Sequence, residues 1–238
     1  MKQLFFATLG LFLLAGITFW TLGQNPQMSP EVLKKMKVIS RFKETLPVAD
    51  SGDAQAQYDV AVMYETGDGT KIDKKQALKW LLKAAEQGHA ESRFKLGWMY
   101  ANGIIVRQDY FMAAKYYRLA ATFNNHIEAQ FRLGELHFNG RGVDHDYGKA
   151  IKYYTQAAGK GHAASQYILS SMYLEGWGVK RDLVTAYVWL TLSMNKRAEA
   201  LAVSKKYDPV LKMKQLRPKM NNFQIDQAQK RILELSTR

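Results

Sequence analysis

Residues 129–158 read AQFRLGELHFNGRGVDHDYGKAIKYYTQAA, and the same order of residue types occurs at three other places in the chain. Each copy has an aromatic side chain near its start. A tyrosine or, once, a histidine follows at a fixed distance, and then a glycine, an aspartate and an alanine. These columns are Tyr58, Phe94, Phe131 and Tyr167; Tyr64, Tyr100, His137 and Tyr173; Gly67, Gly103, Gly140 and Gly176; Asp73, Asp109, Asp146 and Asp182; and Ala77, Ala113, Ala150 and Ala186. A constant period of 36 or 37 residues is typical of repeat proteins, so four copies of one unit are predicted.

Each unit has the pattern of two helices joined by a turn. The first helix of the first unit begins near Ala54 and places apolar residues three or four positions apart, the spacing of an amphipathic helix. A Gly-x-Gly pair ends it, because glycine adopts positive φ at little cost. The second helix begins at the periodic aspartate, whose carboxylate can accept hydrogen bonds from the free amides of the first turn. One helix pair cannot bury its apolar side alone, so the units must stack.

The pattern A-x-Q-[YF]-x-L-G-x-x-Y-x-x-G-x-G-V-x-x-D-x-x-x-A-x-x-[WY]-x-x-x-A-A-x-x-G resembles the Sel-one-like repeat, a relative of the tetratricopeptide repeat. The third unit matches it closely, whereas the second departs at Ile105 and Asn124 and the fourth has Ser193-Met194 in place of the alanine pair. The resemblance covers roughly residues 52–230. It implies an all-α fold, a right-handed α-α superhelix of helix-turn-helix repeats, that binds proteins, often in the bacterial envelope. It implies no catalytic residue.

The repeats divide the chain into segments. The four units cover residues 52–195, at about 52–88, 89–125, 126–161 and 162–195. Residues 24–51 are interpreted as a linker and a half-repeat helix, because a step of 36 back from Ala85 and Gly88 reaches Ala49 and Gly52. Residues 196–238 are predicted to form basic helices that cap the last apolar face, as solenoids require.

Residues 4–22 contain no charge and are mostly Leu, Phe, Ile, Ala and Gly. Nineteen such residues suit an N-terminal hydrophobic helix that crosses a bilayer. Residues 1–23 are either a signal anchor or a cleaved signal peptide. The anchor is favoured, because the run is longer than a usual signal-peptide core and lacks a good cleavage site. The basic residues between positions 34 and 43 would keep the repeats in the cytoplasm by the positive-inside rule, but the order of a short basic start and an apolar run is that of an export signal. We therefore expect a chain anchored in the inner membrane and facing the periplasm, or a periplasmic or secreted chain if it is cleaved.

Charge and composition narrow the classes of function. The net charge is +13, but residues 196–238 hold 11 basic and four acidic side chains and thus more than half of the excess. This basic C-terminal segment could contact anionic lipid or cell-wall polymer, which is the alternative function. Nucleic acid is disfavoured as a partner, because only Tyr207 and Phe223 offer aromatic rings there. The chain has no cysteine, so disulfides and thiolate metal sites are excluded.

No motif predicts a cofactor, a metal ion or catalysis. The five histidines lie in repeat columns or turns, without the close spacing of a ligand set. The periodic aspartates are explained as helix caps, because every unit has one. The chain is therefore expected not to be an enzyme and to bind no cofactor or metal.

Positions that vary between units while their neighbours repeat are not needed for stacking. On the first helices they share one helical face, which usually lines the concave side of such solenoids. Trp98 is the decisive member, since a large aromatic outside the packing columns suits an interface anchor; local packing of its ring is the other interpretation. The predicted partner-binding residues are Asp59, Val62, Glu91, Lys95, Trp98, Asn102, Arg132, Glu135, Asn139, Ile168 and Ser171.

Overall fold

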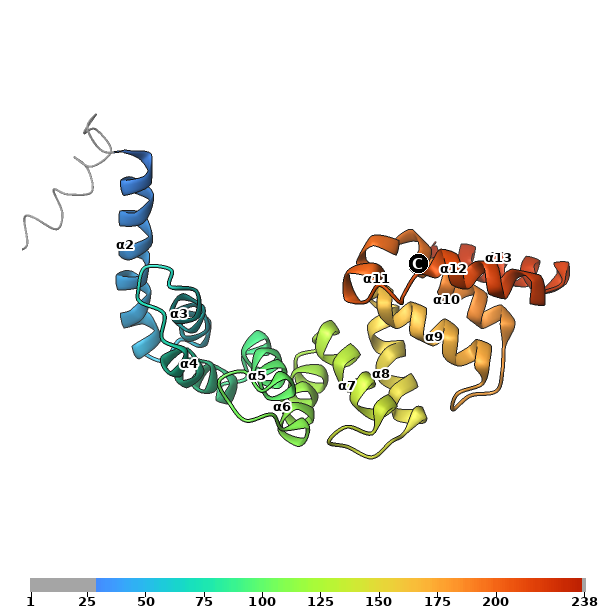
Figure 1. The fold of residues 1–238 in the computed structure, drawn as a ribbon, viewed down its shortest axis with the longest axis horizontal. Helices are drawn as coiled ribbons and strands as arrows, with labels where there is room; N and C mark the ends of the chain where they lie inside the picture. The colour runs from blue at the N-terminus through green and yellow to red at the C-terminus, as the bar shows by residue number, and fades with distance from the viewer. Residues whose placement is uncertain (1–28, 237–238) are drawn as a thin grey trace, which may run out of the picture. The chain divides into compact units, whose positions relative to one another are not determined.

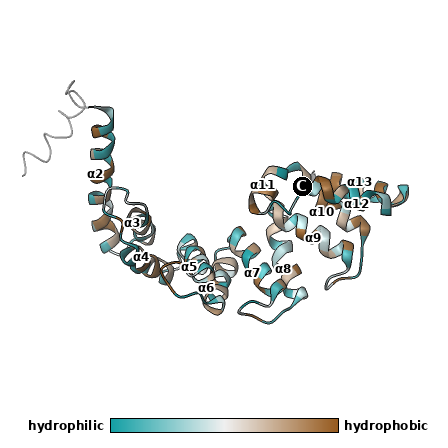
Figure 2. Ribbon diagram, viewed as in Figure 1, coloured by the Kyte–Doolittle hydropathy of each residue, from teal (hydrophilic) through white to brown (hydrophobic). Residues whose placement is uncertain are grey.

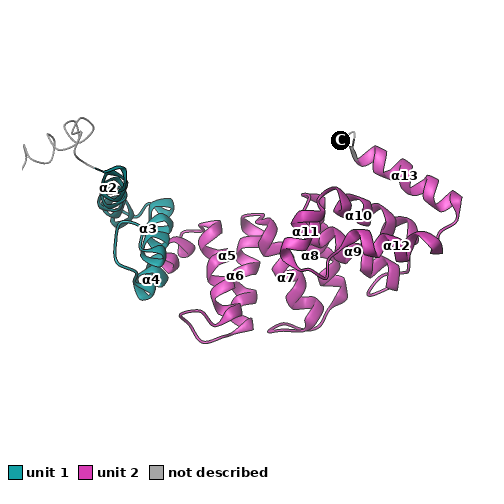
Figure 3. Ribbon diagram, turned by 45° about the horizontal axis from the view of Figure 1, so that its top comes forward, with its two compact units in different colours: residues 1–80 teal, residues 81–238 magenta. Residues whose placement is uncertain are grey.

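The computed structural model describes residues 29–236, which form twelve α-helices and one short 3-10 helix and contain no β-strand. This confirms the all-α prediction. The chain divides into two compact units, Met1–Trp80 and Leu81–Arg238, shown in separate colours in Figure 3. The division falls within helix α4 (Lys74–Glu86).

Unit 1 contains α2 (Pro30–Asp50) and α3 (Ala54–Thr66), which pack against each other. The rings of Phe42 and Tyr64 meet edge to face with centroids 5.4 Å apart. The Nε2 group of Gln57 donates to the carbonyl oxygen of Ala49 at 3.1 Å. Gln130 and Gln166, which hold the same repeat position in unit 2, make the same bond to the second helix of the repeat before them. By this contact, α2 stands before the first repeat as a second helix stands before each later one.

Unit 2 contains further helix pairs and ends in a group of helices that lie outside the repeats (Figure 1). Its helices are α5 (Ala90–Asn102), α6 (Tyr110–Phe123), α7 (Ile127–Asn139), α8 (Tyr147–Gly159), α9 (Ala163–Glu175), α10 (Leu183–Asn195), α11 (Arg197–Val203), α12 (Pro209–Leu216), the 3-10 helix η1 (Arg217–Lys219) and α13 (Asn222–Ser236).

The periodic aspartates start the second helices, as predicted. The side chains of Asp109, Asp146 and Asp182 accept hydrogen bonds from backbone amides in the first turns of α6, α8 and α10. The periodic glycines Gly103, Gly140 and Gly176 end the first helices in the left-handed conformation. These two local signals therefore set the boundaries of each helix pair.

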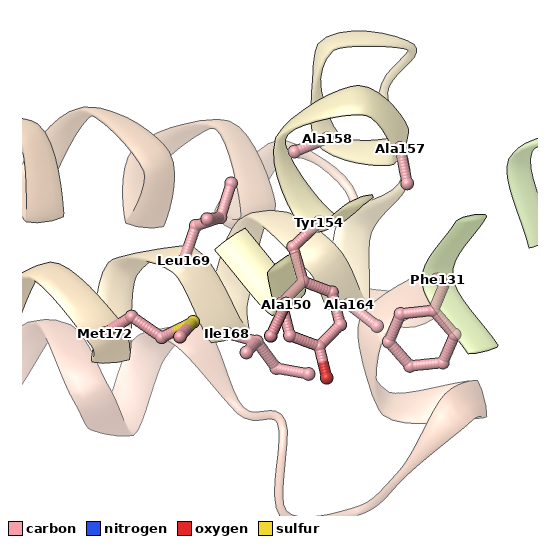
Figure 4. Packing of buried hydrophobic residues seen from close by; sticks show 9 residues of the cluster. All are labelled: Phe131, Ala150, Tyr154, Ala157, Ala158, Ala164, Ile168, Leu169 and Met172. Carbon is pink, nitrogen blue, oxygen red and sulfur yellow. The ribbon is translucent and has the colours of Figure 1, made fainter. Parts of the chain in front are cut away.

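The helices of each pair come closest where the first helix has a small residue. A Cβ atom on Gly134 would lie 2.8 Å from the Tyr154 ring, and one on Gly97 would lie 2.5 Å from the Tyr117 ring. Both tyrosines are almost fully buried. Figure 4 shows Tyr154 within a cluster that also contains Phe131, Ile168 and Met172. Only glycine allows an aromatic ring to pack this closely on a helix backbone.

The C-terminal helices cover the second helix of the last repeat. α10 is apolar around much of its surface, as its colour in Figure 2 shows. Leu190 packs with Leu216 and Ile225, while Val188 packs with Ala228 on α13. The tail thereby buries the apolar side that no further repeat is present to cover.

The predicted membrane segment, residues 4–22, lies outside the described residues. Between residues 29 and 236, none of the helices is both long enough and apolar enough to span a bilayer.

Candidate functional site on the first helices of repeats two to four

One cavity of unit 2 lies between α5 and α7. Its volume is about 390 Å³, and Trp98, Asn102, Arg132, Glu135 and Asn139 line it, all of them predicted site residues. Tyr110, Tyr117 and Arg141 complete its wall. The Trp98 side chain is 37% exposed, so a flat apolar surface is available to a partner at this cavity.

The second cavity adjoins the first, because Glu135 and Asn139 line both. Its volume is about 300 Å³. The predicted residues Ile168 and Ser171 form part of its wall, and five aromatic rings enclose it. These are the side chains of Phe138, Tyr154, Tyr167, Trp177 and Tyr207. We call the two cavities together the paired-cavity face.

One arginine links the charges of this face. Arg132 on α7 forms ion pairs of 2.9 Å with Glu128 and with Glu135. Burial would lower the pKa of the Arg132 guanidinium, but the two carboxylates raise it above its usual value. Burial raises the pKa of Glu135. The pKa of Glu128 is lowered: burial opposes the shift, but hydrogen bonds from His162 and the charge of Arg132 outweigh it.

Two buried tyrosines line the cavities, Tyr117 the first and Tyr154 the second. Burial raises the pKa of both hydroxyls well above the ordinary value. Both side chains are neutral at physiological pH, as unperturbed tyrosines also are, and each has one hydroxyl that can donate a hydrogen bond.

The C-terminal segment lies against the fourth repeat and completes the second cavity. The Tyr207 ring lies 5.2 Å from the Tyr167 ring, and the ammonium group of Lys212 lies 5.5 Å from the centre of Tyr167. A two-bond ion pair of 3.0 and 2.7 Å joins Arg197 to Asp208 and holds this segment, and it keeps the pKa of Asp208 at about 2. Ile168 and Ser171 are consequently buried. Sequence analysis missed this contribution, because the tail lies outside the repeat pattern.

The other four predicted residues lie outside the cavities. Asp59 and Val62 are half-buried on α3 in unit 1, and Asp59 accepts a hydrogen bond from Gln55. Lys95 is half-buried on α5. Glu91 lies 3.1 Å from Nε2 of His126 in the next repeat, so its carboxylate joins neighbouring repeats.

Histidines have a structural role that the sequence analysis did not identify. His89, His126 and His162 cap α5, α7 and α9 by accepting a backbone N–H at Nδ1. Nε2 of His126 and of His162 then lies 3.1 Å from Glu91 and Glu128 of the preceding repeat. The repeat pattern could have revealed this capping role, because Asp53, a residue type that often caps helices, holds the same position in the first repeat.

In the part of the chain that the structure describes, no three His, Asp or Glu side chains are grouped so that they could hold a metal ion. Lys79, Lys115 and Lys152, which share one repeat column, are all exposed and line neither cavity.

The geometry agrees with comparisons to known proteins. The Sel1 repeat model matches residues 54–89, 90–122, 127–162 and 163–193. The chain belongs to the Sel1 repeat family. The described structure resembles c5321, a protective antigen of uropathogenic Escherichia coli with an SLR fold, at a TM-score of 0.63 and 35% identity over 65% of this chain and 33% of that one. It also resembles a Sel1 repeat protein from Oxalobacter formigenes, at a TM-score of 0.61 and 32% identity over 66% of this chain and 64% of that one.

A curated relative from Mus musculus, DAP3-binding cell death enhancer 1, is 32% identical over 92 residues, which is 39% of this chain and 17% of that protein. The chain thus matches only a small part of its length. Sel1 repeat proteins generally mediate protein–protein interactions and are typically non-enzymatic.

Proposed function

We propose that this protein is a non-enzymatic adaptor of the bacterial cell envelope that binds a segment of a partner protein on the paired-cavity face. One observation carries the proposal: seven of the eleven varying positions selected from the sequence line two adjoining cavities. Side chains that vary between repeats and also surround a hollow suit recognition of a particular partner better than a general packing role.

The charges of the face favour an acidic partner. Arg132 is already paired with two carboxylates, whereas Arg141, Lys206 and Lys212 add positive charge at the cavity walls. The aromatic walls suit apolar side chains of the bound segment. We therefore propose a partner segment that combines acidic residues with large apolar ones.

The envelope location rests on the uncharged run at residues 4–22, for which we propose a membrane anchor with the repeats in the periplasm. Cell fractionation tests it: the full-length chain should stay in membranes until detergent is added. A shorter form that begins near Gln24 would show cleavage instead.

The binding proposal is tested by crosslinking the full chain in native membranes, followed by binding measurements with the purified partner. Trp98→Ala should weaken binding by about 30-fold or more, the loss of roughly 2 kcal/mol expected at an interface anchor, with little change in stability. Lys79→Ala and Lys115→Ala are the controls. Equal weakening by the control variants would refute the paired-cavity face as the site.

The alternative is binding of anionic lipid or cell-wall polymer through the C-terminal helices, where Lys205, Lys214, Arg217 and Lys219 are exposed. Steep weakening with salt, together with no effect of Trp98→Ala, would support this alternative.

A further inference from the structure

The N-terminal half of α2 has an exposed apolar stripe. Val32, Met36 and Ile39 are 46%, 40% and 37% exposed. Their spacing of four and then three residues places them on one side of the helix. α3 and the turn after it contact a different side, through Phe42 and through Val38, whose carbonyl lies beside Gly69. Within the described residues of unit 1, the stripe is therefore left uncovered.

The helix that carries this stripe is strongly basic. At about 100° per residue, Lys35 flanks the stripe and Lys43 continues its line, whereas the other basic residues lie toward the opposite side of the helix. Lys34, Lys35, Lys37, Arg41 and Lys43 are all exposed, against only Glu31 and Glu44 in the same stretch. Arg41 is paired with Asp68, and the four lysines have no ion pair among the described residues. A helix with an exposed apolar stripe on one side and basic residues on its polar side is typical of a helix that lies at the surface of an anionic bilayer.

The sequence places this helix close to the proposed anchor. Residues 23–29 separate the uncharged run from α2, and seven residues span at most about 25 Å when fully extended. If residues 4–22 cross the bilayer, the first turns of α2 cannot move far from the headgroups. Basic residues so close to a membrane are attracted to anionic lipid.

We propose that residues 30–43 of α2 lie on the membrane surface, with Val32, Met36 and Ile39 facing the lipid and with the net positive charge of the helix attracted to anionic headgroups. This inference rests on the membrane anchor proposed above, but it concerns a separate surface. The excess of lysine on this part of α2 favours anionic lipid over a second protein, because protein interfaces are depleted of lysine.

The absence of native cysteine makes a direct test possible. Met36→Cys is labelled with the polarity-sensitive dye NBD in the full-length chain, which is then reconstituted into vesicles of phosphatidylcholine with or without phosphatidylglycerol. We expect the emission of the label to shift to the blue and to be quenched by spin-labelled lipid, most strongly when phosphatidylglycerol is present. Val48→Cys is the matched control, because Val48 is an exposed apolar residue of the same helix, roughly 150° around the axis from the stripe.

A charge variant and vesicle flotation complete the test. A variant that combines Lys34→Gln, Lys35→Gln and Lys37→Gln should reduce the blue shift and the lipid quenching of the label at position 36. In vesicles with phosphatidylglycerol, both should fall to the level measured in phosphatidylcholine alone. Vesicles that carry the chain while position 36 stays in water would overturn this inference and leave the anchor intact. Failure of the chain to float with vesicles would overturn both. Equal lipid contact at positions 36 and 48 would also overturn it, since no defined side of α2 would then face the membrane.

Discussion

The close contact between Gly134 and Tyr154 predicts an unusual effect of a glycine-to-alanine substitution in a helix. Alanine normally stabilises a helix interior by about 1 kcal/mol over glycine. At position 134, however, the new Cβ atom would lie 2.8 Å from Cε1 of Tyr154, which is 1% exposed and packs against the rings of Phe131 and Phe138. Overpacking of a filled core costs typically about 1–3 kcal/mol. We therefore expect Gly134→Ala to lower the free energy of unfolding by up to about 2 kcal/mol.

Urea denaturation followed by circular dichroism measures this effect, with a double-mutant cycle to identify its cause. Tyr154→Leu alone should destabilise the protein, because it leaves a cavity. In Tyr154→Leu, the added Gly134→Ala substitution should become neutral or stabilising, which gives a coupling of at least about 1 kcal/mol. The control is Gly159→Ala, near the end of α8, where a Cβ atom meets nothing within 4 Å. If Gly134→Ala stabilises the protein as much as Gly159→Ala does, the close contact is wrong.

Three further substitutions test other local features. Ile105 has φ 69°, and this left-handed conformation costs a non-glycine residue about 1–2 kcal/mol. Ile105→Gly should therefore raise the urea concentration at the midpoint of unfolding. An unchanged or lower midpoint would contradict this prediction. Burial lowers the pKa of His137, so the unfolded chain takes up a proton at a higher pH than the folded chain does, and stability falls as the pH drops below about 6.5. The melting temperature of His137→Tyr should therefore fall less than that of the unsubstituted protein below this pH. Melting temperatures that fall in parallel in the two proteins would refute this prediction. His162→Ala should cost about 1–2 kcal/mol by removing the cap of α9, and His162→Asn should recover part of it in the same urea assay, whereas equal losses would mean that the cap contributes nothing.

The repeated part of the fold was predictable because each unit makes the same contacts and so keeps the same residue types. Asp146 begins a helix and Gly140 ends one for local reasons that the sequence displays. The capping role of His126 was not recognised, since histidine also occurs in many other settings. The role could have been predicted from Asp53, which caps a helix at the same repeat position.

The site was only partly predictable, because part of its wall comes from outside the repeats. The varying positions include Trp98, Arg132 and Glu135, which the structure brings together around one cavity, and their role in binding stays a prediction. Tyr207 reaches the paired-cavity face only because the tail folds back against α9, and no periodicity predicts where a single unrepeated segment will lie. Ile168 was predicted as a partner-binding residue, and this cover buries it.

The packing columns and the paired-cavity face are connected in the two central repeats. Gly97 and Gly134 allow the rings of Tyr117 and Tyr154 to pack closely, and these same tyrosines line the first and second cavities. The fourth repeat has Ser170 and Leu190 in the corresponding columns, a pair that provides no hydroxyl for a cavity wall. The glycine–tyrosine pairs therefore pack these helices together and at the same time bring a side chain with a hydroxyl group to the wall of each cavity. It follows that Tyr154→Phe, which keeps the ring, should leave stability nearly unchanged and alter partner binding alone.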